Sequence, residues 1–408
     1  MSNDLEDQEL GRELGRELRR RSGQPGLHPV SLDEVVGRAR RIKRRRQAAT
    51  GLVAAAVLAV ALPVGVNIVG TTSSTSPGFT DRLTPTATPG QLPAGAVVPL
   101  EPADAPPGDP SAVPYLLDHT LVRPDGSSLR LPEDYRQVGR LGDGWLALRF
   151  DDQGNGTADV LGGDGRVVSS FPADQGLATS PSADRVAVVE RTPSGPVLRL
   201  LAGQGAEIEH WSFAHDVTIA PAGLLSGNRV VYNATTANGE SVAMLASPGD
   251  TQPLSGLVAA QGTEFEAGLV TALTRVTDTG SCSAVVDVET QQRSAATCEL
   301  TLGRFSADGH YLLGHPAYRD GIGDASVAIV DATTGRPVVT FERPGSNYVF
   351  VAETAWEDET HVLATVYDHD AGGWFLLRLG ADGSVENVTG SALPGEDVDA
   401  PVGLTVQP

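Results

Sequence analysis

The 408-residue chain has only two cysteines, Cys282 and Cys298, and a single lysine, Lys43. It also lacks H-E-x-x-H, G-x-S-x-G and C-x-x-C motifs, a phosphate-binding loop and the Asp-box of sialidases. These motifs mark zinc peptidases, serine hydrolases, dithiol oxidoreductases, nucleotide hydrolases and glycosidases. We therefore predict that the protein is not an enzyme and that it has no catalytic, cofactor-binding or metal-binding residues.

Long apolar runs are missing too, apart from one between Ala48 and Gly70. As a helix this uncharged run extends roughly 30 Å, the thickness of the hydrocarbon core of a bilayer. Basic residues directly precede it: Arg38, Arg40, Arg41, Lys43, Arg44, Arg45 and Arg46. By the positive-inside rule, we predict one transmembrane helix over residues 47–70 in the plasma membrane, with a cytoplasmic N-terminus and an extracytoplasmic C-terminal domain.

Two other interpretations of this run are less favoured. A cleaved signal peptide has a short basic segment before its apolar core, whereas 46 residues precede the run here. The small-residue pattern Ala59-Val60-Ala61 lies inside the run instead of after it. A buried core helix is disfavoured by the adjacent basic cluster.

Charge divides the chain at the same place. The net charge is −21 overall, but residues 1–46 carry +4 and the remainder carries −25. An acidic outer domain repels nucleic acids and anionic lipid headgroups, so no nucleic-acid partner is expected. The single lysine beside abundant alanine, valine, glycine and arginine resembles the residue usage of a high-GC actinobacterium.

Two segments flank the predicted helix. Residues 1–46 form a cytoplasmic juxtamembrane segment with weak helical patterns, such as Leu10, Leu14 and Leu18. This segment is either a simple stub or a helix that docks on a cytoplasmic protein. Residues 71–114 are rich in proline, serine, threonine and alanine and predict an extended extracytoplasmic linker.

Residues 115–408 contain a repeat of polar turns and short apolar strands. One series of strand starts recurs at intervals of 40, 44, 40, 41 and 51 residues: Trp145, Arg185, Arg229, Leu269, His310 and His361. A series of turns recurs at 40, 44, 42, 44 and 48 residues: Gly165, Gly205, Gly249, Gln291, Gly335 and Gly383. A single sheet of about 40 residues cannot bury its own faces. When several such sheets are arranged around an axis, each sheet covers the faces of its neighbours. The repeat predicts an all-β protein with the β-propeller fold.

The unit from Gly303 to Phe341 is the clearest. Its segments FSADGHYLL and VAIVDATTGRPV resemble the repeats of WD40-like and TolB-like propellers. This resemblance implies that the Asp308-Gly309 turn joins the two inner strands of a blade, and that the turn from Asp331 to Gly335 joins the two outer strands.

The two ends of the repeat region predict how the ring closes. Residues 115–131 form the outer hairpin of a blade that lacks its inner strands, and Val402 to Val406 form a lone strand. Together they predict a composite closing blade, which gives seven blades in all; six or eight remain alternatives.

The two cysteines flank a turn centred on Thr290-Gln291. Antiparallel pairing about this turn places Cys282 opposite Cys298, so we predict a disulfide on the oxidising side of the membrane. Two unpaired buried cysteines are the alternative.

A few polar residues gather in or beside predicted turns. His310 and His315 lie along one strand, and His361, His369, Asp368 and Asp370 flank another, where a metal site is conceivable but disfavoured. The loop from Asp151 to Gly156 is oxygen-rich, but Gly162 stands where an EF-hand needs glutamate, so a polar strand connection is the better interpretation. With aromatics at 5%, Trp211, Trp356 and Trp374 are interpreted as packing residues.

These observations favour a membrane-anchored extracytoplasmic propeller that binds a protein or cell-envelope ligand and performs no catalysis. The alternative is a transmembrane regulator whose N-terminal segment binds a sigma factor or another cytoplasmic regulator. This layout resembles actinobacterial membrane proteins that control such factors, although the H-x-x-x-C-x-x-C motif of zinc anti-sigma factors is absent from residues 1–46. A propeller hydrolase is a third, less favoured hypothesis.

Overall fold

The computed structural model describes residues 92–407, except residues 319–322, 344–348 and 398–399. The predicted transmembrane helix, its basic cluster and the N-terminal segment lie outside the described residues. No helix within the described ranges is long and apolar enough to cross a membrane. The predictions of anchoring and orientation therefore stay predictions.

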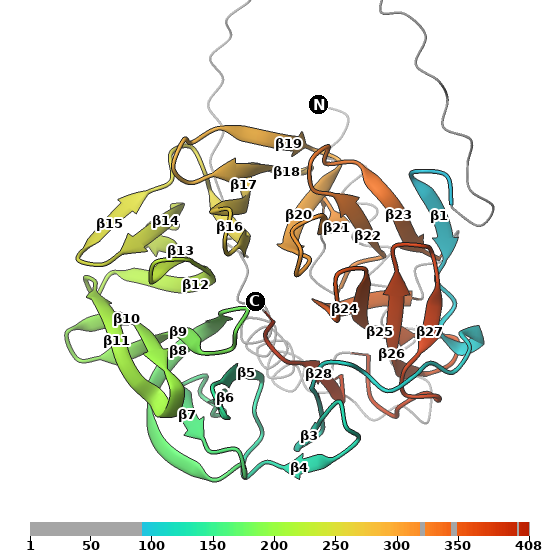
Figure 1. Ribbon diagram of the computed structural model, residues 1–408, viewed down its shortest axis with the longest axis horizontal. Helices are drawn as coiled ribbons and strands as arrows, with labels where there is room; N and C mark the ends of the chain where they lie inside the picture. Colours follow the sequence, from blue (N-terminus) through green and yellow to red (C-terminus); the bar gives the residue numbers. More distant parts are fainter. Residues whose placement is uncertain (1–91, 319–322, 344–348, 398–399, 408) are drawn as a thin grey trace, which may run out of the picture. The chain divides into compact units, whose positions relative to one another are not determined.

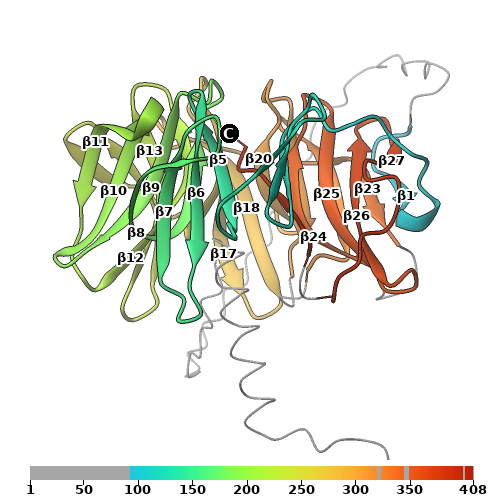
Figure 2. The same ribbon diagram turned by 90° about the horizontal axis from the view of Figure 1, so that it is seen from below.

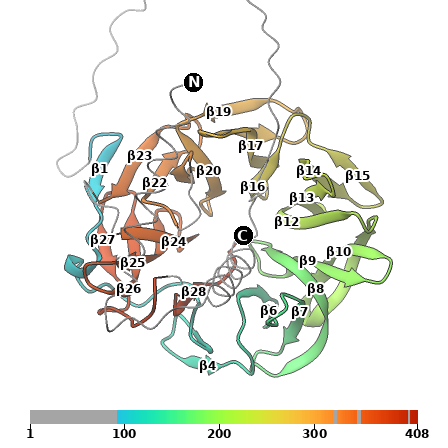
Figure 3. The ribbon, with the colours of Figure 1, turned by 180° about the vertical axis from the view of Figure 1, so that it is seen from behind.

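The regular secondary structure of the described residues is almost entirely β-strand, with two short 3-10 helices, η1 (Pro102–Asp104) and η2 (Gly203–Gly205). Their sheets surround a common axis, and one end strand of each sheet lies nearest to this axis (Figure 1; Figure 3 shows the opposite face). Strands in the middle of a sheet are apolar on both faces, as in β25 (His361–Asp368), because each sheet packs between two neighbours. The predicted all-β propeller is confirmed.

Five of the six sheets contain a single four-stranded antiparallel unit. Their strands are β12 (Val217–Leu225), β13 (Arg229–Thr236), β14 (Ser241–Ser247) and β15 (Asp250–Pro253); β16 (Ala259–Glu264), β17 (Leu269–Thr277), β18 (Gly280–Asp287) and β19 (Arg293–Thr297); β20 (Leu300–Phe305), β21 (Tyr311–Pro316), β22 (Ser326–Asp331) and β23 (Pro337–Glu342); β24 (Val349–Trp356), β25, β26 (Gly373–Gly380) and β27 (Val385–Asn387); and the composite sheet of β2 (Tyr115–Leu117), β3 (Thr120–Val122), β4 (Ser128–Arg130) and β28 (Val402–Leu404).

The sixth sheet holds seven strands. These are β5 (Gln137–Leu141), β6 (Gly144–Phe150), β7 (Gly156–Leu161), β8 (Val167–Thr179), β9 (Arg185–Thr192), β10 (Gly195–Ala202) and β11 (Ala206–Ser212). The 13-residue β8 pairs with β7 through its first part and with β9 through its last part. The prediction of seven separate blades is therefore not confirmed by the sheets of the described chain, because this one long strand joins what the repeat counted as two units.

The innermost strands approach one another closely around the axis. β12, β16, β20 and β24 each carry a β-bulge where they pair with the next strand of their own sheet. A Cβ atom on Gly262 would lie 2.8 Å from the backbone of Arg304 in the adjacent sheet, and one on Gly223 would collide with Thr263. These two glycines are therefore required by the close approach of neighbouring sheets.

Hydrophobic clusters fill the spaces between neighbouring sheets. The largest combines Val339 and Phe341 of β23 with Val366 of β25 and Leu377 of β26, all of them buried. Burying each such large side chain contributes about 1.5–3 kcal/mol, so packing between sheets is a main source of stability. Trp211, Trp356 and Trp374 are 6%, 5% and 1% exposed, which confirms their interpretation as packing residues.

Residues 92–114 depart from the predicted linker. β1 (Ala96–Pro99) pairs in parallel with β23 as a fifth, outermost strand, and the fully buried Leu100 enters the core between two sheets. The chain then forms an isolated bridge from Pro107 to Asn387 of β27 before it enters β2. This N-terminal strap, residues 92–114, thus belongs to the propeller, because its apolar side chains find a sheet edge to cover.

Closure of the ring agrees with the predicted pairing of the two ends. β28 pairs antiparallel with β2, Tyr115 opposite Leu404, and so supplies the innermost strand of the composite sheet. The N-terminal part contributes three strands instead of only the predicted outer hairpin. Beyond β28, the Val406 amide donates to the Val138 carbonyl, which ties the end of the chain to β5.

Candidate functional site

A surface cavity of about 290 Å³, open to solvent, lies where the N-terminal strap passes the ends of two sheets. Its lining comes from the strap, from the residue after β23 and from the end of β25: Glu101, Ala103, Asp104, Arg343, Asp368, Asp370 and Ala371. Because strands in these sheets alternate in direction, the ends of β23 and β25 lie on the same face of the ring (Figure 2 shows the strands from the side). We refer to this cavity as the strap pocket.

Charge organises the strap pocket. Arg343 pairs with Asp368 at 3.2 Å and with Asp370 at 2.9 Å. The Asp368 side chain is 4% exposed, and its Oδ1 also accepts the backbone N–H groups of Asp370 and Ala371. With Glu101 and Asp104 on the opposite wall, four carboxylates face one guanidinium, so the pocket favours a cationic group.

The sequence placed Asp368 and Asp370 near a loop but missed their partner Arg343, which is 25 residues away from Asp368 along the chain. His361 does not lie near these two carboxylates. His361 begins β25 and Asp368 ends it, so an eight-residue strand separates them by roughly 23 Å. Within the described ranges, no three metal-ligating side chains come together.

Three of the histidines singled out in the sequence serve local turns or a single partner, and the ring of the fourth, His369, lies edge-on to Tyr367. His310 Nδ1 lies 2.7 Å from Asp308, and His361 Nδ1 lies 2.9 Å from Asp358, each within its own turn. His315 pairs with the buried Asp324 at 2.8 Å. These contacts stabilise strand connections and do not converge on a shared position.

The oxygen-rich loop after β6 also uses its polar atoms internally. Asp151 Oδ1 accepts the N–H groups of Gln153 and Asn155, and Asp151 Oδ2 accepts the Asn155 side-chain amide. These hydrogen bonds lower the pKa of the Asp151 carboxyl group. The loop therefore has the geometry of a polar strand connection.

One fully buried carboxylate had no signal in the sequence. Asp159 of β7 is 0% exposed and accepts the Tyr135 hydroxyl and Arg149 Nε, each at 2.9 Å, and the Ser170 hydroxyl at 2.5 Å. Burial, followed by the hydrogen bond to Asp159, raises the pKa of Tyr135 above its ordinary range. Since its partners lie on β6 and β8 and just before β5, this cluster joins neighbouring strands of one sheet and is a structural one.

Two charged residues on innermost strands hold the end of the chain. Arg304 of β20 donates to the Gln407 carbonyl, and Glu353 of β24 accepts the Leu404 N–H at 2.9 Å. Burial lowers the pKa of Arg304 and raises the pKa of Glu353. The last residues of the described chain therefore contact the innermost strands of three sheets, through β5, β20 and β24.

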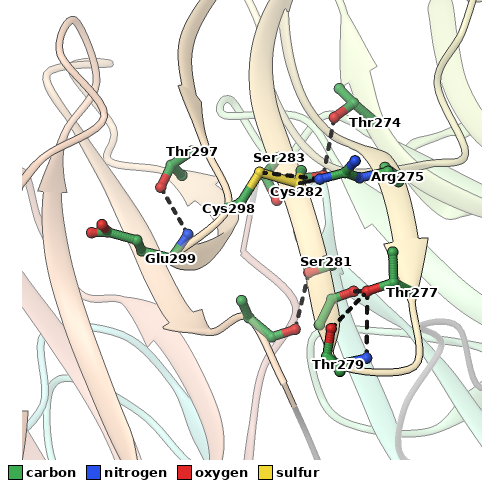
Figure 4. Close-up of a disulfide and its surroundings, with 12 residues drawn as sticks. Thr274, Arg275, Thr277, Thr279, Ser281, Cys282, Ser283, Thr297, Cys298 and Glu299 are labelled. Atoms are coloured by element: carbon green, nitrogen blue, oxygen red, sulfur yellow. Dashed lines mark hydrogen bonds between the residues drawn. A yellow bond between two sulfur atoms is a disulfide. The ribbon is translucent and has the colours of Figure 1, made fainter. Parts of the chain in front are cut away.

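The predicted disulfide between Cys282 and Cys298 is present. It follows the expected register, since Ser283 lies opposite Thr297 in the β18–β19 pair. Figure 4 shows it beside the guanidinium group of Arg275, whose Nη2 lies 3.2 Å from Cys282 Sγ and 4.0 Å from Cys298 Sγ. Arg275 is placed there by the sheet, because it is the cross-strand partner of Cys282. The sequence did not signal this contact.

No family model and no curated protein matches the chain. Among solved structures, a putative TolB from Agrobacterium tumefaciens is 13% identical, with a TM-score of 0.38, over 58% of this chain and 91% of that one. The β-propeller domain of the Trilobed protease from Pyrococcus furiosus is 8% identical, with a TM-score of 0.46, over 66% and 85%. The Synechocystis apocarotenoid oxygenase is 12% identical, with a TM-score of 0.43, over 64% and 73%. These similarities concern the fold and assign no activity.

Proposed function

We propose that the chain is a single-pass membrane protein whose extracytoplasmic propeller is a binding module with no catalysis of its own. The observation that carries this proposal is the strap pocket, an acidic cavity on a rigid all-β frame. The candidate histidines, by contrast, are engaged in local turns. The apolar run of residues 48–70 and the basic cluster before it support the anchoring. The disulfide supports an oxidising compartment for the propeller.

The strap pocket points to a cationic ligand. Its walls come from the N-terminal strap, from the residue after β23 and from the end of β25, so its shape depends on the folded ring. A lysine or arginine side chain of a protein, or an amine of a cell-envelope component, complements the excess of carboxylates. Glu101 and Asp370 are exposed enough to meet such a group, although Asp370, like the buried Asp368, also pairs with Arg343.

Crosslinking of the full chain in its native membrane tests both parts of the proposal. One affinity tag is placed on residues 1–46 and another at the end of the propeller, and captured proteins are identified by mass spectrometry. Envelope proteins crosslinked near residues 101–104 or 368–371, and lost with Asp370→Asn, support the binding module. A control substitution at the exposed Asp250 of β15 should retain capture. Capture that is also unchanged by Asp370→Asn would argue against the pocket.

The same experiment tests the regulator alternative. Reproducible capture of a sigma factor or another cytoplasmic regulator through residues 1–46 would make that function the better description. Turnover of peptides, glycosides or esters by the purified chain would overturn the proposal that the module has no catalysis.

We also infer that the ring contains seven blades, because the seven-stranded sheet counts as two of them. The seven-stranded sheet bends at a bulge in β8 between Ala173 and Leu177, and a hydrophobic cluster with Leu148, Val160 and Val188 packs across that bend. Such a cluster is the kind found between separate sheets elsewhere in the ring, for example around Phe341. Solution scattering by the protein, compared with six-, seven- and eight-bladed rings, tests the count.

A further inference from the structure

The two sulfur atoms of the disulfide lie in different surroundings. Cys298 follows the end of β19, the outermost strand of its sheet, and is exposed, whereas Cys282 on β18 is half-buried. The Arg275 guanidinium is closer to Cys282 Sγ, at 3.2 Å, than to Cys298 Sγ, at 4.0 Å. A thiol in solution therefore meets Cys298 first, and a positive charge stands beside the other sulfur (Figure 4).

The strand that carries Cys282 is held firmly on both sides of this residue. The hydroxyl groups of Ser281 and Thr301 lie 2.8 Å apart, and Ser283 Oγ accepts the Leu302 N–H at 3.2 Å. Thr274 Oγ1 donates to the Cys282 carbonyl at 3.2 Å. Cys282 therefore stays next to Arg275 whether or not the bond to Cys298 is intact.

We propose that the Cys282–Cys298 bond is a thiol-exchange site, at which a small-molecule thiol or an exposed dithiol attacks Cys298 Sγ and Cys282 departs as a thiolate next to Arg275. This inference does not depend on the ligand of the strap pocket.

The exchange balances with a thiol as the only co-reactant. The attacking thiolate forms a bond to Cys298 Sγ, the Cys282–Cys298 bond breaks, and its electron pair goes to Cys282 Sγ. A second thiolate then attacks the non-protein sulfur of the mixed disulfide and releases Cys298 as a thiolate. The protein gains two electrons and the thiols are oxidised to their disulfide. A leaving thiolate beside a cation departs faster, so the role of Arg275 is to stabilise the Cys282 thiolate electrostatically.

The sheet retains its edge when the bond opens. Arg293 of β19 donates to the Ser255 and Gly256 carbonyls of the neighbouring sheet, and Ala295 is buried in the cluster around Phe305. These contacts keep β19 in place without the covalent link, so exchange is reversible and does not require unfolding.

Glutathione is the probe in the decisive experiment. The full chain in detergent is mixed with glutathione near pH 7, quenched with acid and an alkylating reagent, and mapped by peptide mass spectrometry. We expect glutathione on Cys298 and a free thiol on Cys282. Arg275→Gln should slow exchange by about three- to tenfold, and Arg275→Lys should restore most of the rate. Arg130→Gln, at an exposed arginine on β4 of the composite sheet, is the matched control and should leave the rate unchanged.

Single-cysteine variants give an independent measurement. In Cys298→Ser, the Cys282 thiol should alkylate with a pH midpoint below about 8.5, and adding Arg275→Gln should raise this midpoint. In Cys282→Ser, the Cys298 midpoint should stay near about 8.5. Glutathione on Cys282, equal rates with and without Arg275, or exchange only under unfolding conditions would overturn the proposal.

Discussion

Two sheets of the ring are secured at their edges in different ways. The composite sheet is closed without a covalent bond, by the three-residue β28 and its buried Val402 and Leu404. The sheet of β16–β19 is continuous in the chain and carries the disulfide on its outermost strand. The non-covalent closure lies at the axis, on the innermost strand of its sheet, and the covalent link lies at the rim, on the outermost strand of its sheet. The difference shows that buried area and long-range hydrogen bonds can replace a crosslink.

The largest effect is expected from Val402→Asp in the composite sheet. Val402 is 1% exposed, so the new carboxylate would be buried without a partner, and we expect a loss of about 3–5 kcal/mol in the free energy of unfolding. Urea unfolding followed by circular dichroism measures it. Val168→Asp on β8, where the valine is 63% exposed, is the control and should remain close to the wild type. Equal stabilities would show that β28 does not hold the ring.

Removing the disulfide should cost less. The two cysteines are 16 positions apart in the chain, and the double variant Cys282→Ser/Cys298→Ser removes the link that closes this loop. We expect the free energy of unfolding to fall by about 3 kcal/mol without loss of the fold. Thermal unfolding with and without reductant measures the difference. If reductant lowers the melting temperature of the double variant as much as that of the wild type, the crosslink is not the cause.

The strap that leads into the composite sheet depends on a buried ion pair. Arg378 of β26 contacts Glu357 through two nitrogen atoms, with Nη2–Oε1 at 2.8 Å, and also donates to the Pro110 carbonyl. The Arg378 side chain is 12% exposed and that of Glu357 is 1% exposed. Arg378→Met leaves Glu357 unpaired and should cost about 2 kcal/mol, and adding Glu357→Gln should recover part of it. A double variant as unstable as the sum of the singles would contradict coupling of the pair.

The smallest effect concerns Glu353, which accepts the Leu404 N–H at the closing seam. Burial raises its pKa, while the Leu404 N–H and the charge of Arg136 act in the opposite direction. Because the folded-state pKa is above the ordinary value of 4.5, the folded protein holds this proton more tightly than the unfolded chain. The Glu353 contribution to stability is therefore full below about pH 4.5 and decreases as the pH rises to the raised pKa.

Glu353→Gln removes this dependence and keeps an acceptor for Leu404. We expect the stability of the variant relative to the wild type to increase with pH from about 4.5 upward. Urea unfolding at several pH values measures the trend. A difference that is constant with pH, or that falls, would contradict a raised pKa.

Much of the fold could be predicted from short-range patterns. The Asp308-Gly309 turn joins β20 to β21, and the turn ending at Gly335 joins β22 to β23, as the repeat implied. The strand starts of the repeat fall on the second strand of a four-stranded unit, since Arg229, Leu269 and His361 begin β13, β17 and β25. The innermost strands were harder to recognise because their bulges and glycines interrupt the alternation of apolar residues.

The candidate sites were less predictable. A disulfide between residues related by a hairpin follows from the centre of the turn, so Cys282 and Cys298 could be paired in advance. Arg275 and Arg343 had no such signal, because each reaches its partners through a strand pairing or a sheet contact that no local spacing encodes. The strand expected between His361 and Asp368 is present as β25, and these two residues lie at its opposite ends.

The sequence alone determined the all-β class, the repeated turns, the disulfide and the joining of the two ends in one sheet. Each of these depends on residue types at short range or on a period that recurs along the chain. Only the tertiary structure decided that residues 92–114 cover the sheet edges, that β8 unites two units, and which charges meet in the strap pocket. The physical reason is that edge pairing, bulges and ion pairs across sheets depend on distances between segments that are remote in the chain.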